Sequence, residues 1–230
     1  MKKLGLLFFF VPLRKMKYLS VITSMLVSEP DNKVLFKSMG DTGIVAFRGT
    51  QTLEDVWYDI DVRPKIWPPD DFSSRMWVHG GFASLTKKLW KDVEPFVDHH
   101  EKIIVGGHSL GSCCACLSAS RVESIHSEKV VSVYTFGMPK LAGPKFKAYY
   151  KRQGLNSKTF NFFTTSDPVV FLRLPPVYAS VGKFIHLPYN DSNLLKHHDV
   201  RTYHKLIKET LEQHEESKKK DILSDGWYEI

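Results

Sequence analysis

The chain has 230 residues, of which 43% are hydrophobic and 25% are charged, a length and composition that fit one globular domain. The composition excludes a collagen-like, a low-complexity and a wholly disordered protein. No apolar stretch reaches the roughly 18 residues that a membrane-spanning helix needs. The formal net charge of +7 is spread along the chain, apart from a lysine run at 218–220, so nucleic-acid binding is not expected.

The N-terminus places two lysines before an apolar run at 4–13, a pattern typical of a signal peptide. Basic residues follow at once, without a small-x-small cleavage pattern, which favours a short anchor or a packed first element over cleaved secretion. We expect an N-terminal apolar segment (1–27), one α/β domain (28–216) and a charged tail (217–230). An intracellular, peripherally membrane-associated protein is favoured, with secretion as the alternative, and nothing in the sequence indicates an oligomeric state.

Apolar runs and helical spacing predict an alternation of strands and helices along the domain. In chain order they predict a strand at 44–47, a helix at 82–99, a strand at 103–105, a helix at 110–122, a strand at 130–136, a helix after Gly143-Pro144, strands at 159–163 and 183–187, and a helix at 199–216. This alternation indicates an α/β fold with a mostly parallel central sheet flanked by helices. The three cysteines lie within four residues of one another in the second helix, where we expect them to be core residues rather than metal ligands or disulfides.

A nucleophile motif lies directly after the strand at 103–105. Gly107-His108-Ser109-Leu110-Gly111 has the pattern G-x-S-x-G and opens the following helix. A sharp strand-to-helix turn exposes the serine hydroxyl, and the glycines let the helix pack close to the strand. The backbone N–H of Leu110 lies at the helix N-terminus, where it can stabilise an oxyanion. Ser109 is therefore the predicted nucleophile.

A serine nucleophile needs a base and a carboxylate that orients the base. Asp167 follows the strand at 159–163, at the sheet edge where α/β folds bind ligands. The candidate bases downstream are His186, His197, His198 and His204. His197 and His198 stand before the last helix on an expected loop that can reach this edge, and chemistry alone does not separate them.

Six ordered motifs resemble the class 3 lipases, the fungal-lipase-like family of α/β-hydrolases. They are Phe47-Arg48-Gly49-Thr50, Val78-His79-Gly80-Gly81-Phe82, the G-x-S-x-G motif, Thr135-Phe136-Gly137-Met138-Pro139-Lys140, the segment from Asn161 through Asp167-Pro168-Val169 to Leu174-Pro175-Pro176, and His198-Asp199-Val200 with Tyr203. The resemblance implies Ser109 as nucleophile, Asp167 as acid and His198 as base. It also implies an oxyanion hole from Thr50 and the Leu110 N–H, with no metal or organic cofactor.

The segment after Thr50 bears on the substrate. An apolar stripe at helical spacing is formed by Leu53, Val56, Trp57 and Ile60. In the family this segment is a lid that opens at a lipid surface, and the alternative here is a fixed surface helix. The predicted function is hydrolysis of triacylglycerol, diacylglycerol or phospholipid esters, with contact to a lipid surface. The alternatives are a soluble carboxylesterase or acyltransferase, and an inactive hydrolase fold that serves as a binding module.

Overall fold

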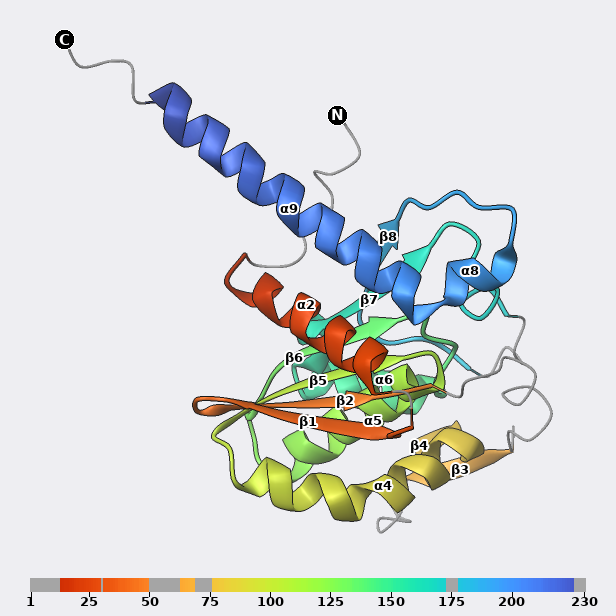
Figure 1. Cartoon of the computed structure of the whole chain (residues 1–230). Helices are drawn as coiled ribbons and strands as arrows, with labels where there is room; N and C mark the ends of the chain where they lie inside the picture. Colours follow the sequence, from red (N-terminus) through yellow and green to blue (C-terminus); the bar gives the residue numbers. More distant parts are fainter. Residues whose placement is uncertain (1–12, 30, 50–62, 69–75, 173–177, 226–230) are drawn as a thin grey trace.

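The computed structural model describes residues 13–29, 31–49, 63–68, 76–172 and 178–225 (Figure 1). At its centre lies a six-stranded sheet in the order β1-β2-β5-β6-β7-β8. The strands are β1 (Val34–Met39), β2 (Thr42–Phe47), β5 (Lys102–His108), β6 (Val130–Phe136), β7 (Thr159–Thr164) and β8 (Lys183–Leu187). Strand β1 is antiparallel to β2, and every later neighbour pair is parallel. The prediction of an α/β fold with a mostly parallel sheet is confirmed.

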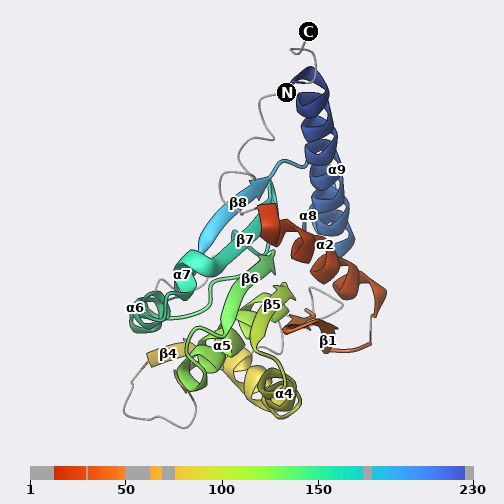
Figure 2. The same cartoon turned by 90° about the vertical axis from the view of Figure 1, so that its left-hand side faces the viewer.

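Helices cover both faces of this sheet (Figures 1 and 2). One face carries α4 (Gly80–Asp98), α5 (Leu110–Ile125), α6 (Pro144–Arg152) and the short α7 (Leu155–Lys158), and the other carries α2 (Leu13–Ser28) and α9 (Val200–Asp225). Successive strand residues alternate between the two cores: Val105 packs on the α5 side and Ile104 on the α2 side. Burial on both faces explains why the central strands are continuous apolar runs.

Helix α2 shares a core with the sheet. Leu19, Ile22 and Leu26 are fully or almost fully buried. A Cβ atom on Gly106 of β5 would lie 2.4 Å from the Ile22 side chain, so the absence of a side chain at Gly106 permits this close approach. Among the described residues, no helix combines the length and the apolar character needed to cross a membrane.

Several elements differ from the sequence prediction. Strand β1 and the two-stranded sheet of β3 (Pro64–Trp67) and β4 (Met76–His79) were not predicted. Strand β1 is largely exposed and polar in part, and its pairing with β2 stabilises it. The last helix continues to Asp225, beyond the expected end at residue 216, through a segment that contains the run Lys218–Lys220, and lysine is a good helix former. The expected loop that carries His197 and His198 is the short helix α8 (Leu194–His198).

Candidate active site

The turn between β5 and α5 holds Ser109 in a strained conformation. Its φ is 56° and its ψ is −129°, outside the regions that ordinary residues prefer. A Cβ atom on Gly107 would lie 2.2 Å from the Gly111 carbonyl oxygen, and one on Gly111 would lie 2.2 Å from the Phe47 carbonyl oxygen. The two glycines therefore allow α5 to begin directly against the ends of β5 and β2, which leaves the serine at the tip of the turn.

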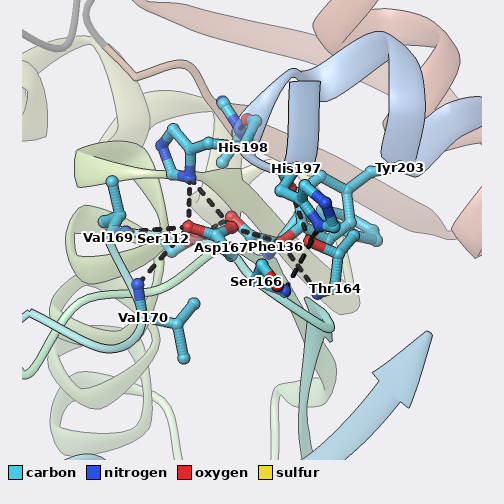
Figure 3. A network of polar contacts seen from close by, with 11 residues as sticks. Ser112, Phe136, Thr164, Ser166, Asp167, Val169, Val170, His197, His198 and Tyr203 are labelled. Atoms are coloured by element: carbon cyan, nitrogen blue, oxygen red, sulfur yellow. Dashed lines mark hydrogen bonds and ion pairs between the residues drawn. The ribbon is translucent and has the colours of Figure 1, made fainter. Parts of the chain in front are cut away.

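A buried carboxylate–imidazole pair lies at the same end of the sheet. Asp167 follows β7 and is fully buried, and His198 ends α8. The Nδ1 atom of His198 lies 2.9 Å from each carboxylate oxygen of Asp167 (Figure 3). The Val169 N–H donates to Oδ1 at 2.9 Å, and the Tyr203 hydroxyl donates to Oδ2.

These contacts determine the charge of Asp167 and show which nitrogen of His198 faces it as a donor. Burial opposes the charge on Asp167, but hydrogen bonds from His198, Tyr203 and Val169 outweigh it and lower the pKa of the carboxyl. An ionised carboxylate can only accept, so Nδ1 of His198 carries the proton. Its Nε2 is then the atom free to act as a base. Both His198 Nε2 and Ser109 Oγ are buried and lack a hydrogen-bond partner among the described residues.

His108, the last residue of β5, supports the His198 imidazole. Its ring centroid lies 4.8 Å from that of His198, and its Nε2 lies 2.7 Å from the His198 carbonyl oxygen. Burial, followed by the proximity of His198, lowers the pKa of His108 to about 3. The ring is therefore neutral, and because a carbonyl only accepts, Nε2 is its donor.

Four strand ends converge here, as expected for the carboxyl edge of a parallel sheet. Gly137 follows β6 with φ +62°, and a Cβ atom there would lie 2.7 Å from Asp167 Oδ2 and 2.8 Å from the His198 ring. Gly49 follows β2, and a Cβ atom there would lie 2.7 Å from the Ser109 Cβ. Two glycine backbones thus border the serine and the carboxylate–imidazole pair, where a side chain would displace them.

The predicted site residues divide into two groups. Ser109, Asp167 and His198 lie at this edge, and Leu110 is the first residue of α5. The remaining predicted residues lie outside the described part of the chain: Thr50, Leu53, Val56, Trp57 and Ile60.

The other candidate bases are held elsewhere. His186 contacts the Thr165 hydroxyl at 3.0 Å, and His204 contacts the Thr23 hydroxyl at 2.9 Å. His197 contacts the Ser166 N–H, the Thr164 hydroxyl and the Asp191 carbonyl oxygen, and it makes no contact with the Asp167 carboxylate (Figure 3).

Sequence reasoning missed two contributors to the site. Tyr203 was noted only as part of the histidine motif, and its bond to Asp167 joins residues that are distant in sequence. Gly137 was part of a matched motif, but its place against the pair depends on the fold. The three cysteines of α5 are buried in the core, as predicted. The described residues hold no group of three or more His, Cys, Asp or Glu side chains placed to bind a metal ion.

Comparison with known proteins agrees with this architecture. The family model described as Lipase (class 3) matches residues 44–177. Lipases of Rhizopus niveus and Rhizopus oryzae are each 30% identical over 148 residues, which is 60% of this chain and 37% of theirs. The chain therefore spans little more than a third of the length of these curated relatives.

Solved structures of fungal lipases share the fold. The lipase of Rhizopus microsporus var. chinensis superposes with a TM-score of 0.61 at 20% identity, covering 77% of this chain and 76% of that one. Lipase II of Rhizopus niveus superposes with a TM-score of 0.60 at 19% identity, covering 77% and 82%. At these identities the likeness establishes the fold of the chain and nothing further.

Proposed function

The chain belongs to the class 3 lipase family, and from this premise we propose that it hydrolyses carboxylic esters of lipids through an acyl-enzyme on Ser109. One observation carries the proposal. Within the part of the chain that the structure describes, Nε2 of the His198 imidazole has no hydrogen-bond partner, and neither has the Ser109 hydroxyl in the strained turn at the same sheet edge. Unsatisfied buried polar atoms are rare, and a pair that can pass one proton is what acyl transfer requires.

The proposed reaction has two halves. Ser109 Oγ attacks the ester carbonyl carbon while His198 Nε2 takes the hydroxyl proton, and Asp167 stabilises the imidazolium that results. The alcohol leaves with that proton. Water then attacks the acyl-enzyme by the same route and releases the fatty acid. No step uses a metal ion or an organic cofactor.

The negative charge that forms on the carbonyl oxygen needs donors. The Leu110 N–H is in the first turn of α5, where backbone donors have no partner within the helix. We assign the second donor to Thr50. Its support is the neighbouring Gly49, whose backbone lies against Ser109. Each such donor contributes about 2.7–4 kcal/mol to lowering the barrier.

The proposed substrates are water-insoluble esters met at a lipid surface. The apolar stripe of Leu53, Val56, Trp57 and Ile60 directly follows the proposed oxyanion residue in sequence. Burial of this stripe in lipid is favourable by about 25 cal/mol per Å² of apolar area. The net charge of +7 adds attraction to anionic lipid.

The rates of hydrolysis of insoluble lipids and of a soluble ester test the proposal. Emulsified tri- and diacylglycerol, phospholipid vesicles and a short soluble ester are offered to the purified parent and to Ser109→Ala. We expect hydrolysis of the insoluble lipids, abolished in Ser109→Ala. Turnover of the short ester alone would make the chain a soluble esterase. Absence of turnover by the folded parent would favour the binding module.

The proposed contact of the apolar stripe with a lipid surface is tested separately. Trp57→Ser should weaken hydrolysis of emulsified or vesicular lipid much more than hydrolysis of the short soluble ester, once the variant is shown to be folded. Equal losses on both substrates would assign this segment to the scaffold.

A further inference from the structure

We propose that His197 is a positioning residue that sets the geometry of the Asp167–His198 pair without contacting the substrate. The proposal rests on the proposed function, because it concerns the same reaction. Its basis is a set of contacts that join the segment before Asp167 to the segment before His198 through a single imidazole (Figure 3).

The His197 ring is buried and both of its nitrogens are engaged. The Ser166 N–H donates to Nδ1 at 3.2 Å, so Nδ1 carries no proton. Nε2 lies 3.0 Å from the Asp191 carbonyl oxygen, which can only accept, so Nε2 carries the proton. The side chain is only 2% exposed, and the Tyr189 ring packs against it edge-on, with 4.9 Å between the two ring centroids. The Thr164 hydroxyl also lies 3.2 Å from Nδ1, so three polar groups hold the orientation of the ring.

The backbone of His197 is anchored as well. The Thr164 hydroxyl donates to the His197 carbonyl oxygen at 2.7 Å. Thr164 is the last residue of β7, so the end of that strand holds the main chain of α8. His197 is thus fixed at its carbonyl by Thr164, at Nδ1 by Ser166 and at Nε2 by Asp191.

These contacts lie one residue away from Asp167 and His198, so they control the alignment of the carboxylate and the imidazole. Ser166 immediately precedes Asp167, and His197 immediately precedes His198. The bond from the Ser166 N–H to the His197 ring therefore ties the two segments together one residue away from the carboxylate and the imidazole. Both carboxylate oxygens lie 2.9 Å from His198 Nδ1, an alignment that a small shift of either segment would break.

The same contacts exclude His197 as a spare base. Its only acceptor nitrogen is occupied by the Ser166 N–H, and its other nitrogen donates to Asp191. Loss of the ring would leave the Ser166 N–H without its acceptor, and an unpaired buried donor favours rearrangement of the loop. A misplacement of about 1 Å at a reacting group costs on the order of 10²-fold in rate.

Three substitutions separate the contacts. His197→Ala removes the bond at Nδ1 and the bond at Nε2. His197→Asn offers an amide oxygen where Nδ1 accepts, and His197→Gln offers an amide N–H where Nε2 donates. His100→Ala is the matched control. His100 is also buried and bonded at both nitrogens, to the Phe96 carbonyl and the Ser38 hydroxyl, but it precedes β5 at the opposite edge of the sheet.

Steady-state hydrolysis of a short soluble ester gives the first result. We expect His197→Ala to lower kcat about 10- to 100-fold, with KM changed less than about twofold, since alignment and not binding is lost. His197→Asn should restore most of kcat, whereas His197→Gln should not. His100→Ala should lower Tm and leave kcat unchanged. An unchanged kcat in His197→Ala, or no advantage of Asn over Gln, would overturn the proposal.

A second readout does not depend on turnover. The downfield proton resonance of His198 Nδ1 reports its bond to Asp167, and it is measured in a Ser109→Ala background. We expect the resonance to shift or broaden in the His197→Gln protein and to persist in the His197→Asn and His100→Ala proteins. An unperturbed resonance in His197→Gln refutes the positioning role. If the parent hydrolyses no ester, the proposed function fails and this resonance still decides the role of His197. If His197→Ala does not fold, the Asn and Gln variants decide it.

Discussion

Replacing Tyr203 by phenylalanine removes one hydroxyl from the site and leaves the ring in place. That hydroxyl donates to Asp167 Oδ2. The other oxygen, Oδ1, also accepts from the Val169 N–H, so Oδ2 is the one that depends on Tyr203. Tyr203 is fully buried, which keeps bulk water from replacing the lost donor. A hydrogen bond to a charged group contributes about 1.5–3 kcal/mol, so we expect the free energy of unfolding to fall by that amount at neutral pH.

The loss should depend on pH. The pKa of Asp167 is lowered in the folded protein, so its ionised form stabilises the fold at any pH above the unfolded-chain pKa of about 3.9. This contribution is lost as the pH falls through the lowered pKa. The difference in stability between the parent and Tyr203→Phe should therefore be constant from about pH 5 to 8 and should narrow below about pH 4.

Urea denaturation followed by tryptophan fluorescence across this pH range measures the effect. Tyr150→Phe is the matched control, because its buried hydroxyl contacts the neutral Thr159 hydroxyl at 2.7 Å. It should cost about 0.5–1.5 kcal/mol and show no such narrowing. Tyr203→Phe should also lower kcat, while Tyr150→Phe should not. Equal losses with equal pH dependence would refute the assignment of Tyr203 to an ionised Asp167.

Three further predictions concern separate parts of the site and core. Gly137→Ala and Gly154→Ala both place a side chain at positive φ, at a cost of about 1–2 kcal/mol each. Only Gly137→Ala should also reduce kcat, because its Cβ meets the Asp167–His198 pair whereas Gly154 faces open space. Equal kcat values in the two variants would contradict the close packing of Gly137 against this pair. Thr50→Val should raise the barrier by about 2.7–4 kcal/mol, measured as kcat/KM on a soluble ester, and an unchanged rate would remove Thr50 from the mechanism. The cysteine thiols of α5 are buried, which raises their pKa values, to about 12 for two of them, so a thiol reagent should label the chain only after denaturation; rapid labelling of the native protein would show that α5 opens.

The strand-turn-helix setting of Ser109, the proposed nucleophile, was predictable because its signal is local. A strand, a G-x-S-x-G turn and a small-residue helix follow one another without a gap, and β5 and α5 flank Ser109 as that pattern requires. Asp167 was found by its place after a strand. The edge strand β1 was missed because lysine and serine interrupt its apolar pattern, and its pairing with β2 supplies what the local sequence does not.

The distinction between His197 and His198 needed more than local chemistry. Their resemblance to a family motif selected His198, but the physical reason lies in α8. Successive residues of a helix point about 100° apart, so the two rings leave the chain in different directions. One meets the Asp167 carboxylate and the other meets the Ser166 N–H. Tyr203 joins this network from α9 through the folded chain, a contact that no local pattern predicts.

Covalent labelling tests the central claim most directly. A lipid-like phosphonate that reacts with activated serines is added to the folded parent, and the modified residue is identified by peptide mass spectrometry. We expect one adduct, on Ser109. In His198→Ala its rate of formation should fall by at least about 10²-fold, because the general base is lost. Absence of an adduct, modification at another residue, or an equal labelling rate in His198→Ala would contradict a serine nucleophile activated by His198.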